Sequence, residues 1–437
     1  MTCGNYRGLS MLAVARKSYT RILKKRMERR LEEVLGEEQA GFRPGRSTTD
    51  MVFVLRQLAE KFIEYNLTLY NTFIDYSKAF DTIWREFMWQ VLNHFGFSKK
   101  LIEAIKTLYE ANQSAVVVEN EITEFFTTSI GVLQGCILSP PLFNLALEAV
   151  LNLSQKEIED IGVKIYGKMY NNMRYADDID AIAESEEDLQ RVTTAIDESS
   201  RRSGMVINLD KTKTMVIGRG HKDINITINN QVLEQVKSFV YLGSNITENN
   251  EHIADVKRRL NIAREKFYKL ETIWKDKYIS DDLKVRLLHA LITPIATYGC
   301  ETWTLTEEIK QKIEAFEMTC YRYIANIHWS EHITNEHVLK LLNTSTCILS
   351  RIYTAHARYL GHVLRMPDSR LPRQALEMRV SGRRPRGRPR YRWFQRIQKE
   401  LNLSSREITN LAGSRADWRR ATHDVDATST TPRRDAV

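Results

Sequence analysis

The acidic residues of the segment MRYADDIDAIAES, residues 173–185, are the part of the sequence best suited to chemistry. Asp177 and Asp178 are adjacent, and Asp180 follows two residues later in a run that is otherwise apolar. Aspartate disfavours strands and is costly to bury without a partner. Adjacent carboxylates here therefore indicate a divalent cation, although a solvated turn is the ordinary alternative. We expect Asp180 to face solvent or to form a salt bridge, and not to bind metal.

A further carboxylate, Asp75, ends the apolar run NTFIDYS, which has the composition of a buried strand. A carboxylate at the end of one strand and a pair at a hairpin turn can converge at one edge of a sheet. Such oxygens suit Mg²⁺, and two ions about 4 Å apart can activate a 3′-hydroxyl and stabilise a leaving pyrophosphate. We therefore predict two Mg²⁺ ions on Asp75 and Asp177, with Asp178 as a third ligand or as electrostatic support.

The elements that must position these carboxylates follow from the spacing of apolar residues. We expect helices at 11–36, 50–65, 82–95, 98–111 and 186–203. We expect strands at 67–77, on both sides of the YADD turn, on both sides of residues 119–121, and around residues 229–230.

After residue 250 the sequence changes character. One helical stripe of apolar residues begins there, formed by Ile253, Val256, Leu260, Ala263, Phe267, Leu270 and Trp274. Similar spacing at 280–292 and 306–327 predicts an all-helical domain. We expect the polar tail from residue 415 to be frayed.

The size and composition fit a protein of two or three domains that binds a polyanion. The chain has 437 residues, and its 64 Lys and Arg residues exceed its 55 Asp and Glu residues, for a net charge of +9. Its five cysteines are scattered, which fits a reducing compartment better than a disulfide framework. Because we find no signal peptide or transmembrane segment, we expect an intracellular protein, in the nucleus or cytoplasm, with no membrane partner.

Several motifs occur in a fixed order along the chain: QAGFRPGRSTTD, FIDYSKAFD, GVLQGCILSPPLFN, YADD, NLDKTKTM and YLGS. This ordered set resembles the reverse transcriptases of non-long-terminal-repeat (LINE-type) retrotransposons. The resemblance implies an α+β right-hand polymerase, with fingers, a palm that carries an antiparallel catalytic sheet, an all-α thumb and a basic C-terminal extension.

The resemblance also implies a domain division. We expect partial fingers at 1–66, a palm at 67–249, a helical thumb at 250–345, a basic nucleic-acid-binding region at 346–412 and a disordered tail at 413–437. Because the sequence begins at the fingers motif, we expect it to lack the endonuclease domain that family members usually carry upstream.

Several nucleotide-binding roles follow from the resemblance. Phe80 matches the residue that packs under the incoming sugar and excludes a 2′-hydroxyl, although an ordinary core Phe is the alternative. Gln134 and Gly135 match the loop beside the nucleotide, or else form a simple turn before a helix. The remaining substrate-binding candidates are Tyr175 and the arginines Arg7, Arg43 and Arg46, whose guanidinium groups suit phosphates.

Two further motifs are assigned in the same way. Lys211 and Lys213 are the candidates that protonate or neutralise pyrophosphate, and we prefer Lys211, although an ordinary surface lysine is the alternative. Phe239, Tyr241 and Gly243 resemble the hairpin that holds the primer end, although FVYLG also suits an ordinary core strand.

The segment RVSGRRPRGRPRYRWFQR, residues 379–396, contains eight arginines and no acidic residue. Its Pro and Gly residues oppose a regular helix, and its composition suits contacts with a nucleic-acid backbone and with bases. A nuclear-import signal or a disordered linker is the alternative. The candidates for nucleic-acid binding are Arg383, Arg384, Arg386, Arg388, Arg390 and Trp393.

Together these features predict an RNA-directed DNA polymerase that transfers nucleotides from dNTPs to a DNA primer on an RNA template. A catalytically inactive or domesticated remnant that only binds nucleic acid is the first alternative. A polymerase that copies RNA into RNA, or DNA into DNA, is the second, and Phe80 argues against the use of ribonucleotides.

Overall fold

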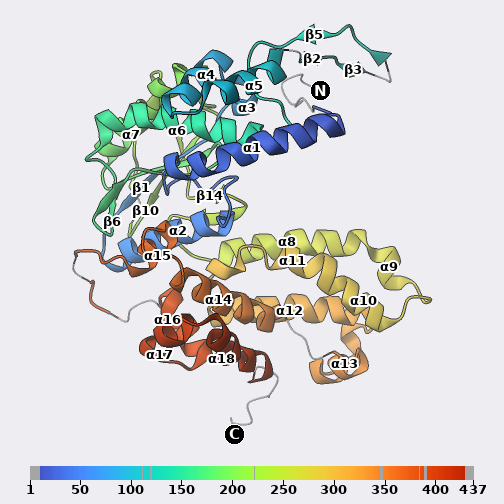
Figure 1. The fold of residues 1–437 in the computed structure, drawn as a ribbon. Coiled ribbons are helices and arrows are strands. Elements are labelled where there is room, and N and C mark those ends of the chain that lie inside the picture. The colour runs from blue at the N-terminus through green and yellow to red at the C-terminus, as the bar shows by residue number, and fades with distance from the viewer. Residues whose placement is uncertain are drawn as a thin grey trace. The chain divides into compact units, whose positions relative to one another are not determined.

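The computed structural model describes residues 10–110, 112–118, 121–220, 222–344, 348–382, 384–387 and 391–428. The chain divides into two compact units, drawn in Figure 1. The first unit comprises Met1–Met51 and Thr68–Lys237, and the second comprises Val52–Leu67 and Ser238–Val437. The boundary near residue 237 lies close to the predicted end of the palm, whereas most of the second predicted helix falls in the second unit.

The centre of the first unit is a five-stranded sheet in the order β13-β10-β1-β9-β8. Strand β1 is antiparallel to both of its neighbours, and all six of its residues are buried, including the polar Asn71 and Thr72. The strands are β1 (Leu69–Ile74), β8 (Asn172–Tyr175), β9 (Asp178–Ala183), β10 (Lys213–Ile217) and β13 (Glu234–Gln235).

Helices of the first unit cover this sheet. Helix α7 packs on β1 and β9 and against α6, while α1 and α4 contact α6 (Figure 1). The helices are α1 (Val14–Val34), α3 (Ala79–Thr82), α4 (Arg85–His94), α5 (Lys99–Glu110), α6 (Ser139–Ile158) and α7 (Glu186–Arg201). The helices and the sheet expected in this region from apolar spacing are therefore confirmed.

Small antiparallel ladders complete the first unit. The ladder near residues 229–230 is confirmed: β11 and β12 flank Asn229 and Asn230, both with positive φ, as its tight turn requires. The short strands are β2 (Gln113–Ser114), β3 (Val117–Val118), β4 (Glu121–Ile122), β5 (Phe126–Thr127), β6 (Val163–Ile165), β7 (Lys168–Tyr170), β11 (Thr227–Ile228) and β12 (Gln231–Val232).

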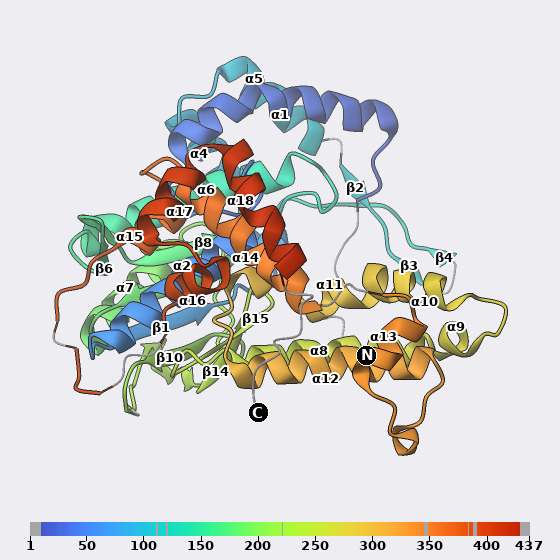
Figure 2. The ribbon, with the colours of Figure 1, turned by 90° about the horizontal axis from the view of Figure 1, so that it is seen from below.

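The second unit is helical apart from one hairpin. Most of helix α2 (Thr48–Glu64) belongs to this unit, from Val52 onwards. Strands β14 (Ser238–Tyr241) and β15 (Ser244–Thr247) form the hairpin. In this unit α8 and α12 run side by side (Figure 2). The α-helices from the hairpin to residue 341 are α8 (Ile253–Lys269), α9 (Glu271–Lys275), α10 (Asp281–Leu287), α11 (Thr293–Ala296), α12 (Glu307–Ile324) and α13 (Asn335–Leu341). A π-helical turn (Leu288–Ile292) and two short 3-10 helices (Cys300–Thr302 and Trp329–Glu331) lie among them. The all-helical segment predicted after residue 250 is confirmed.

The C-terminal region is more regular than its composition indicated. It forms α14 (Ile348–Leu364), α15 (Leu371–Glu377), α16 (Trp393–Leu401), α17 (Ser405–Ala412) and α18 (Arg415–Thr428). The expectation of a frayed tail is wrong for α18, because Trp418 is buried and its indole nitrogen donates to the Ala357 carbonyl at 2.9 Å. Among the described residues, no helix has the length and apolar character that crossing a bilayer requires.

Candidate active site

The turn between β8 and β9 carries the paired aspartates. Tyr175 pairs with Asp178 at the end of the ladder, so Ala176 and Asp177 form a two-residue turn. Ala176 has φ of +60°, a backbone conformation that is strained for a residue with a Cβ. The predicted strand–turn–strand is therefore confirmed, and Asp177 lies at its tip.

The third carboxylate comes from the adjacent strand. Ile74, the last residue of β1, pairs with Ile179 of β9. Continuing this antiparallel register by one residue places Asp75 opposite Asp178. Asp75, Asp177 and Asp178 therefore lie at the same end of the sheet.

The charges of these residues influence one another. The pKa of Asp178 is raised to about 6, first by loss of hydration and then by the negative charges of Asp177 and Asp75. Asp75 Oδ2 is buried and accepts no hydrogen bond among the described residues, and Lys211 Nζ lies 3.6 Å away. Three carboxylates that repel one another, one of them with a buried oxygen that accepts no hydrogen bond, form a donor set that suits hard divalent cations.

This donor set is not a closed metal cage. Among the described residues, no group of three or more His, Cys, Asp or Glu side chains is arranged to hold a metal ion. Asp75, Asp177 and Asp178 fit the ions by their chemistry and by their common position at the sheet end.

The loop before β10 positions Lys211. The backbone N–H of Asn208 donates to the Asp75 carbonyl at 2.8 Å, and the Asn208 side-chain oxygen accepts from the Lys211 N–H at 3.2 Å. The Lys211 ammonium is largely exposed beside Asp75, whereas Lys213 pairs with Glu234 at 2.7 Å. The geometry therefore favours Lys211 over Lys213 as the cation of this site.

Asp180 differs from our expectation. It is fully buried and accepts hydrogen bonds from Asn71 Nδ2 at 2.9 and 3.1 Å, so the prediction that it is solvent-facing or salt-bridged is wrong. Burial raises the pKa of its carboxyl well above the usual range. The hydrogen-bonding partner, Asn71, lies across the ladder on β1, where sequence spacing gives no signal.

Gln39 is a site residue that the motif analysis left without a role. Its buried side-chain oxygen accepts from the Ala176 N–H at 2.9 Å and from the Gly41 N–H at 2.7 Å, and its amide nitrogen donates to the Ala176 carbonyl at 3.3 Å. A Cβ on Gly41 would lie 2.2 Å from the Ala176 nitrogen, so only glycine allows this approach. Gln39 therefore holds the strained turn that carries Asp177. The sequence feature that could have indicated this role is the Gln-x-Gly spacing of Gln39 and Gly41.

Phe80 and Gln134 occupy positions beside this end of the unit. The Phe80 ring is partly exposed and stacks on Phe143 with ring centroids 4.3 Å apart. Gln134 donates to Asp81 Oδ1 at 2.8 Å, and the exposed Gly135 has φ of +100°. The nucleotide-binding roles of Phe80, Gln134, Gly135 and the half-buried Tyr175 remain predictions.

Two of the predicted phosphate-binding arginines have internal partners. Arg43 is buried, pairs with Glu32 at 2.8 Å and donates to the Gln39 carbonyl at 3.0 Å. Arg46 makes two hydrogen bonds of 2.6 Å to Glu37. Both guanidinium groups therefore hold the loop after α1, which corrects their assignment to substrate. Arg7, the third candidate, lies outside the described residues.

In the second unit, Phe239 and Tyr241 lie on β14, and Gly243 lies in the turn to β15. Leu242 and Gly243 both have positive φ, and the Gly243 carbonyl accepts from Arg258 Nη1 at 3.1 Å. The hairpin is confirmed, while its contact with a primer remains a prediction.

The Arg-rich segment does not present Trp393 to solvent. Trp393 is buried against Phe53 and Tyr359, and its indole nitrogen donates to the Glu301 carbonyl at 2.9 Å. The stacking role assigned to Trp393 is therefore wrong, because its ring belongs to the core. Among the arginines, Arg384 pairs with Glu64, Arg386 is exposed, and Arg383, Arg388 and Arg390 lie outside the described residues.

The family pattern described as "Reverse transcriptase (RNA-dependent DNA polymerase)" matches residues 2–246, more than half of the chain. The chain belongs to the reverse transcriptase family. This confirms the expected family and the α+β fold class of a right-hand polymerase. The match ends within the hairpin that precedes α8.

Curated relatives include several retrotransposon proteins. The "Transposon TX1 uncharacterized 149 kDa protein" of Xenopus laevis is 27% identical over 55% of this chain and 18% of its own length. The type-2 retrotransposable element R2DM polyprotein of Drosophila melanogaster is 27% identical over 41% of this chain and 17% of its own length. The "RNA-directed DNA polymerase from mobile element jockey" of Drosophila funebris is 21% identical over 74% of this chain and 36% of its own length. The chain spans well under half of these three proteins.

Solved structures with a similar chain trace include a Candida tropicalis telomerase bound to a fragment of telomeric RNA. The match has a TM-score of 0.39 and 13% identity, and it covers 76% of this chain and 57% of that one.

The raised pKa of Asp178 predicts how the folding stability of this reverse transcriptase changes with pH. The folded-state value of about 6 lies above the ordinary value, so the folded protein binds the proton more tightly than the unfolded chain. Ionisation of Asp178 therefore destabilises the fold as the pH rises from about 4 to 6. We expect Asp178→Asn, without divalent ions, to raise the thermal midpoint at pH 7.5 by about 2–4 °C, because screening limits the gain to about 1 kcal/mol.

The gain should shrink as the pH falls towards 4, and excess Mg²⁺ should reduce it. Asp160→Asn is the matched control, since Asp160 is exposed in the same unit. A gain that is constant from pH 4 to 7.5, or that is equal in the control, would contradict the electrostatic explanation.

Proposed function

We propose that the protein is an RNA-directed DNA polymerase of retrotransposon origin. The observation that carries this proposal is the placement of Asp75, Asp177 and Asp178 at one end of the sheet. Loss of hydration, and then the charges of Asp177 and Asp75, raise the pKa of Asp178 there. The proposed substrates are dNTPs, a DNA primer and an RNA template.

Asp75 and Asp177 are the proposed holders of two Mg²⁺ ions, and Asp178 is a further ligand or a source of negative potential. When bound, such ions activate the primer 3′-hydroxyl and stabilise the leaving pyrophosphate. Lys211 would neutralise or protonate the leaving group, and its exposed ammonium 3.6 Å from Asp75 supports this role. Phe80 would support the sugar, and fixed positions for these groups supply orientation and charge stabilisation.

The test is extension of a labelled DNA primer on RNA and DNA templates of identical sequence, with Mg²⁺ titrated against EDTA. We expect dNTP incorporation on RNA that requires Mg²⁺. Extension on DNA alone would support the DNA-copying alternative. No extension on either template by a folded protein would support a remnant that only binds nucleic acid.

Gln39 gives a prediction that tests the clamp on the catalytic turn. Gln39→Met keeps the side-chain volume but removes both hydrogen bonds to Ala176, so we expect a loss in kcat of about 10–100-fold with KM for dNTP changed much less. Ala176→Gly should restore much of this activity in the double variant, because glycine adopts positive φ without a clamp. The measurement is single-nucleotide incorporation.

Ala176→Gly alone serves as the control and should stay close to the wild type. If the double variant is as slow as Gln39→Met, the hydrogen bonds of Gln39 do not act by holding Ala176 at positive φ. A Gln39→Met variant with unchanged kcat would contradict the positioning role.

Phe80 gives a prediction about sugar selection. Phe80→Ala removes the ring that stacks on Phe143, so a 2′-hydroxyl would meet less obstruction. We expect the ratio of NTP to dNTP incorporation to rise by about tenfold or more, equivalent to about 1.4 kcal/mol or more. Phe87→Ala, which removes a partly buried Phe on α4, is the control. An unchanged ratio in Phe80→Ala would contradict the steric role.

A further inference from the structure

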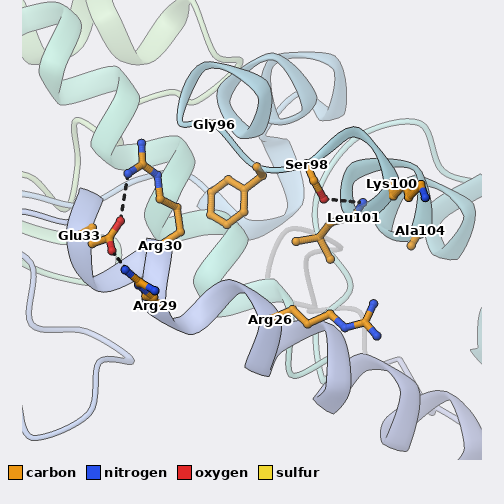
Figure 3. A pocket seen from close by; sticks show the side chains of 10 residues that line it. Arg26, Arg29, Arg30, Glu33, Gly96, Ser98, Lys100, Leu101 and Ala104 are labelled. Atoms are coloured by element: carbon orange, nitrogen blue, oxygen red, sulfur yellow. Dashed lines mark hydrogen bonds and ion pairs between the residues drawn. The ribbon is translucent and has the colours of Figure 1, made fainter.

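A basic pocket lies between α1 and the start of α5, in the first unit. It encloses about 540 Å³. Figure 3 shows Glu33 between Arg29 and Arg30 at one end of this pocket, and Arg26 and Lys100 along the rest. Four cations therefore line the pocket together with one carboxylate.

The single carboxylate does not neutralise the pocket. Glu33 pairs with Arg29 at 3.2 Å and with Arg30 at 3.0 Å. Arg26 and Lys100 are both exposed, and within the described part of the chain neither side chain forms an ion pair or a hydrogen bond. Two extended cations that face the same hollow without an acidic partner leave a net positive charge there.

Two fixed features add to this charge. Arg30 Nε donates to the Phe95 carbonyl at 2.7 Å, which orients its guanidinium group. Helix α5 has 12 residues and begins at Lys99. The N–H groups of Leu101 and Ile102 donate to the Ser98 carbonyl at 2.9 and 3.0 Å, so within the described part of the chain only the N–H groups of Lys99 and Lys100 are left at this helix start, beside the pocket. Backbone donors and guanidinium groups at one place are the combination that binds phosphate.

The pocket continues an exposed basic row on α1. Lys17, Arg21, Lys25 and Arg29 follow one another at four-residue steps and all are exposed, while the opposite face of the helix buries Leu23, Met27 and Leu31. Side chains spaced in this way are neighbours on the helix surface. A row of cations that leads into a pocket fits a string of phosphates better than a single small anion.

We propose that this pocket, with the basic row on α1, binds the phosphodiester backbone of a single-stranded RNA. The inference concerns phosphate binding, and only its choice of RNA rests on the proposed function. The contact is with the backbone, so it is independent of base sequence.

The experiment is fluorescence anisotropy of labelled oligouridine and of a mixed-sequence RNA of the same length, in EDTA and without dNTPs. Arg26→Ala combined with Lys100→Ala is compared with Lys164→Ala combined with Arg202→Ala, which removes two exposed cations elsewhere in the unit. We expect the pocket variant to lose about tenfold in affinity for both RNAs. The negative slope of log K against log salt should become less steep by about 1.4, because two phosphate contacts are lost. The control should change less than twofold.

Arg26→Lys combined with Lys100→Arg keeps the charge and should bind like the wild type. Equal losses in the pocket variant and the control, or a loss for one RNA sequence only, would overturn the proposal. So would a pocket variant that loses binding of inorganic phosphate but keeps its RNA affinity, because that marks a small-anion site. The assay contains EDTA and no dNTPs, so it measures RNA binding without nucleotide incorporation, and a failure of the polymerase assignment would not appear as a failure here.

Discussion

Replacing Asp177 by Asn is expected to reduce nucleotide incorporation on an RNA template by about 10³-fold or more, which corresponds to about 4 kcal/mol of transition-state stabilisation. Asn keeps the size of the side chain but removes the negative charge at the tip of the turn. The turn itself should persist, since Gln39 clamps Ala176 through backbone groups that the substitution leaves in place. The loss should therefore appear in kcat, with RNA affinity unchanged.

The matched control is again Asp160→Asn, an equal change of charge at an exposed position of the same unit. It should incorporate nucleotides at nearly the wild-type rate. Mn²⁺ should not fully restore the activity of Asp177→Asn, because Asn offers either ion only one neutral oxygen in place of a charged carboxylate. Equal rates for the wild type and Asp177→Asn would remove this residue from the reaction and defeat the two-metal assignment.

The second large effect concerns stability and lies in the second unit. Asp255 is fully buried and accepts hydrogen bonds from Arg56 Nη2 at 2.7 Å, Trp303 Nε1 at 3.1 Å and the Asn245 N–H at 2.8 Å. Asp255→Ala would leave the buried Arg56 guanidinium without its counter-ion. We expect a loss of about 3–5 kcal/mol, and a fall of the thermal midpoint by about 6–20 °C.

Replacing both Arg56 and Asp255 distinguishes the cost of an unpaired buried charge from the loss of the ion pair itself. Arg56→Met combined with Asp255→Leu should lose much less than Asp255→Ala, because apolar residues leave no unpaired buried charge. Asp282→Ala, at an exposed position on α10, should change stability by less than about 0.5 kcal/mol. A loss below about 1 kcal/mol in Asp255→Ala, measured by urea and thermal unfolding, would show that Arg56 finds another partner.

The spacing of apolar residues along the chain was enough to predict many of the helices and strands. The stripe that buries Val256, Leu260, Ala263 and Phe267 predicted α8, and the short, mainly apolar run of residues 67–77, rich in residues that favour strands, predicted β1. These patterns are readable because burial of one helix face, or of a whole central strand, imposes a fixed spacing on neighbouring residues.

Roles that depend on a distant partner were predicted less well. The guanidinium groups of Arg43 and Arg46 suit phosphate, yet they pair with Glu32 and Glu37. Trp393 lies within an arginine-rich segment, yet its ring is buried by contacts with Phe53 and Tyr359. A single sequence shows that an arginine needs an anion or that a tryptophan needs contacts, but not which atoms supply them.

The sequence by itself determined the family, the helical character after residue 250, and the carboxylates to be expected at a strand end and at a hairpin turn, because ordered motifs and apolar spacing are local properties. Only the tertiary structure decided that Asp75 stands opposite Asp178, that Gln39 holds the turn that carries Asp177, and that Asp180 is buried against Asn71. Those relations depend on strand register and on close approach between segments far apart in the chain, which residue spacing along the chain does not encode.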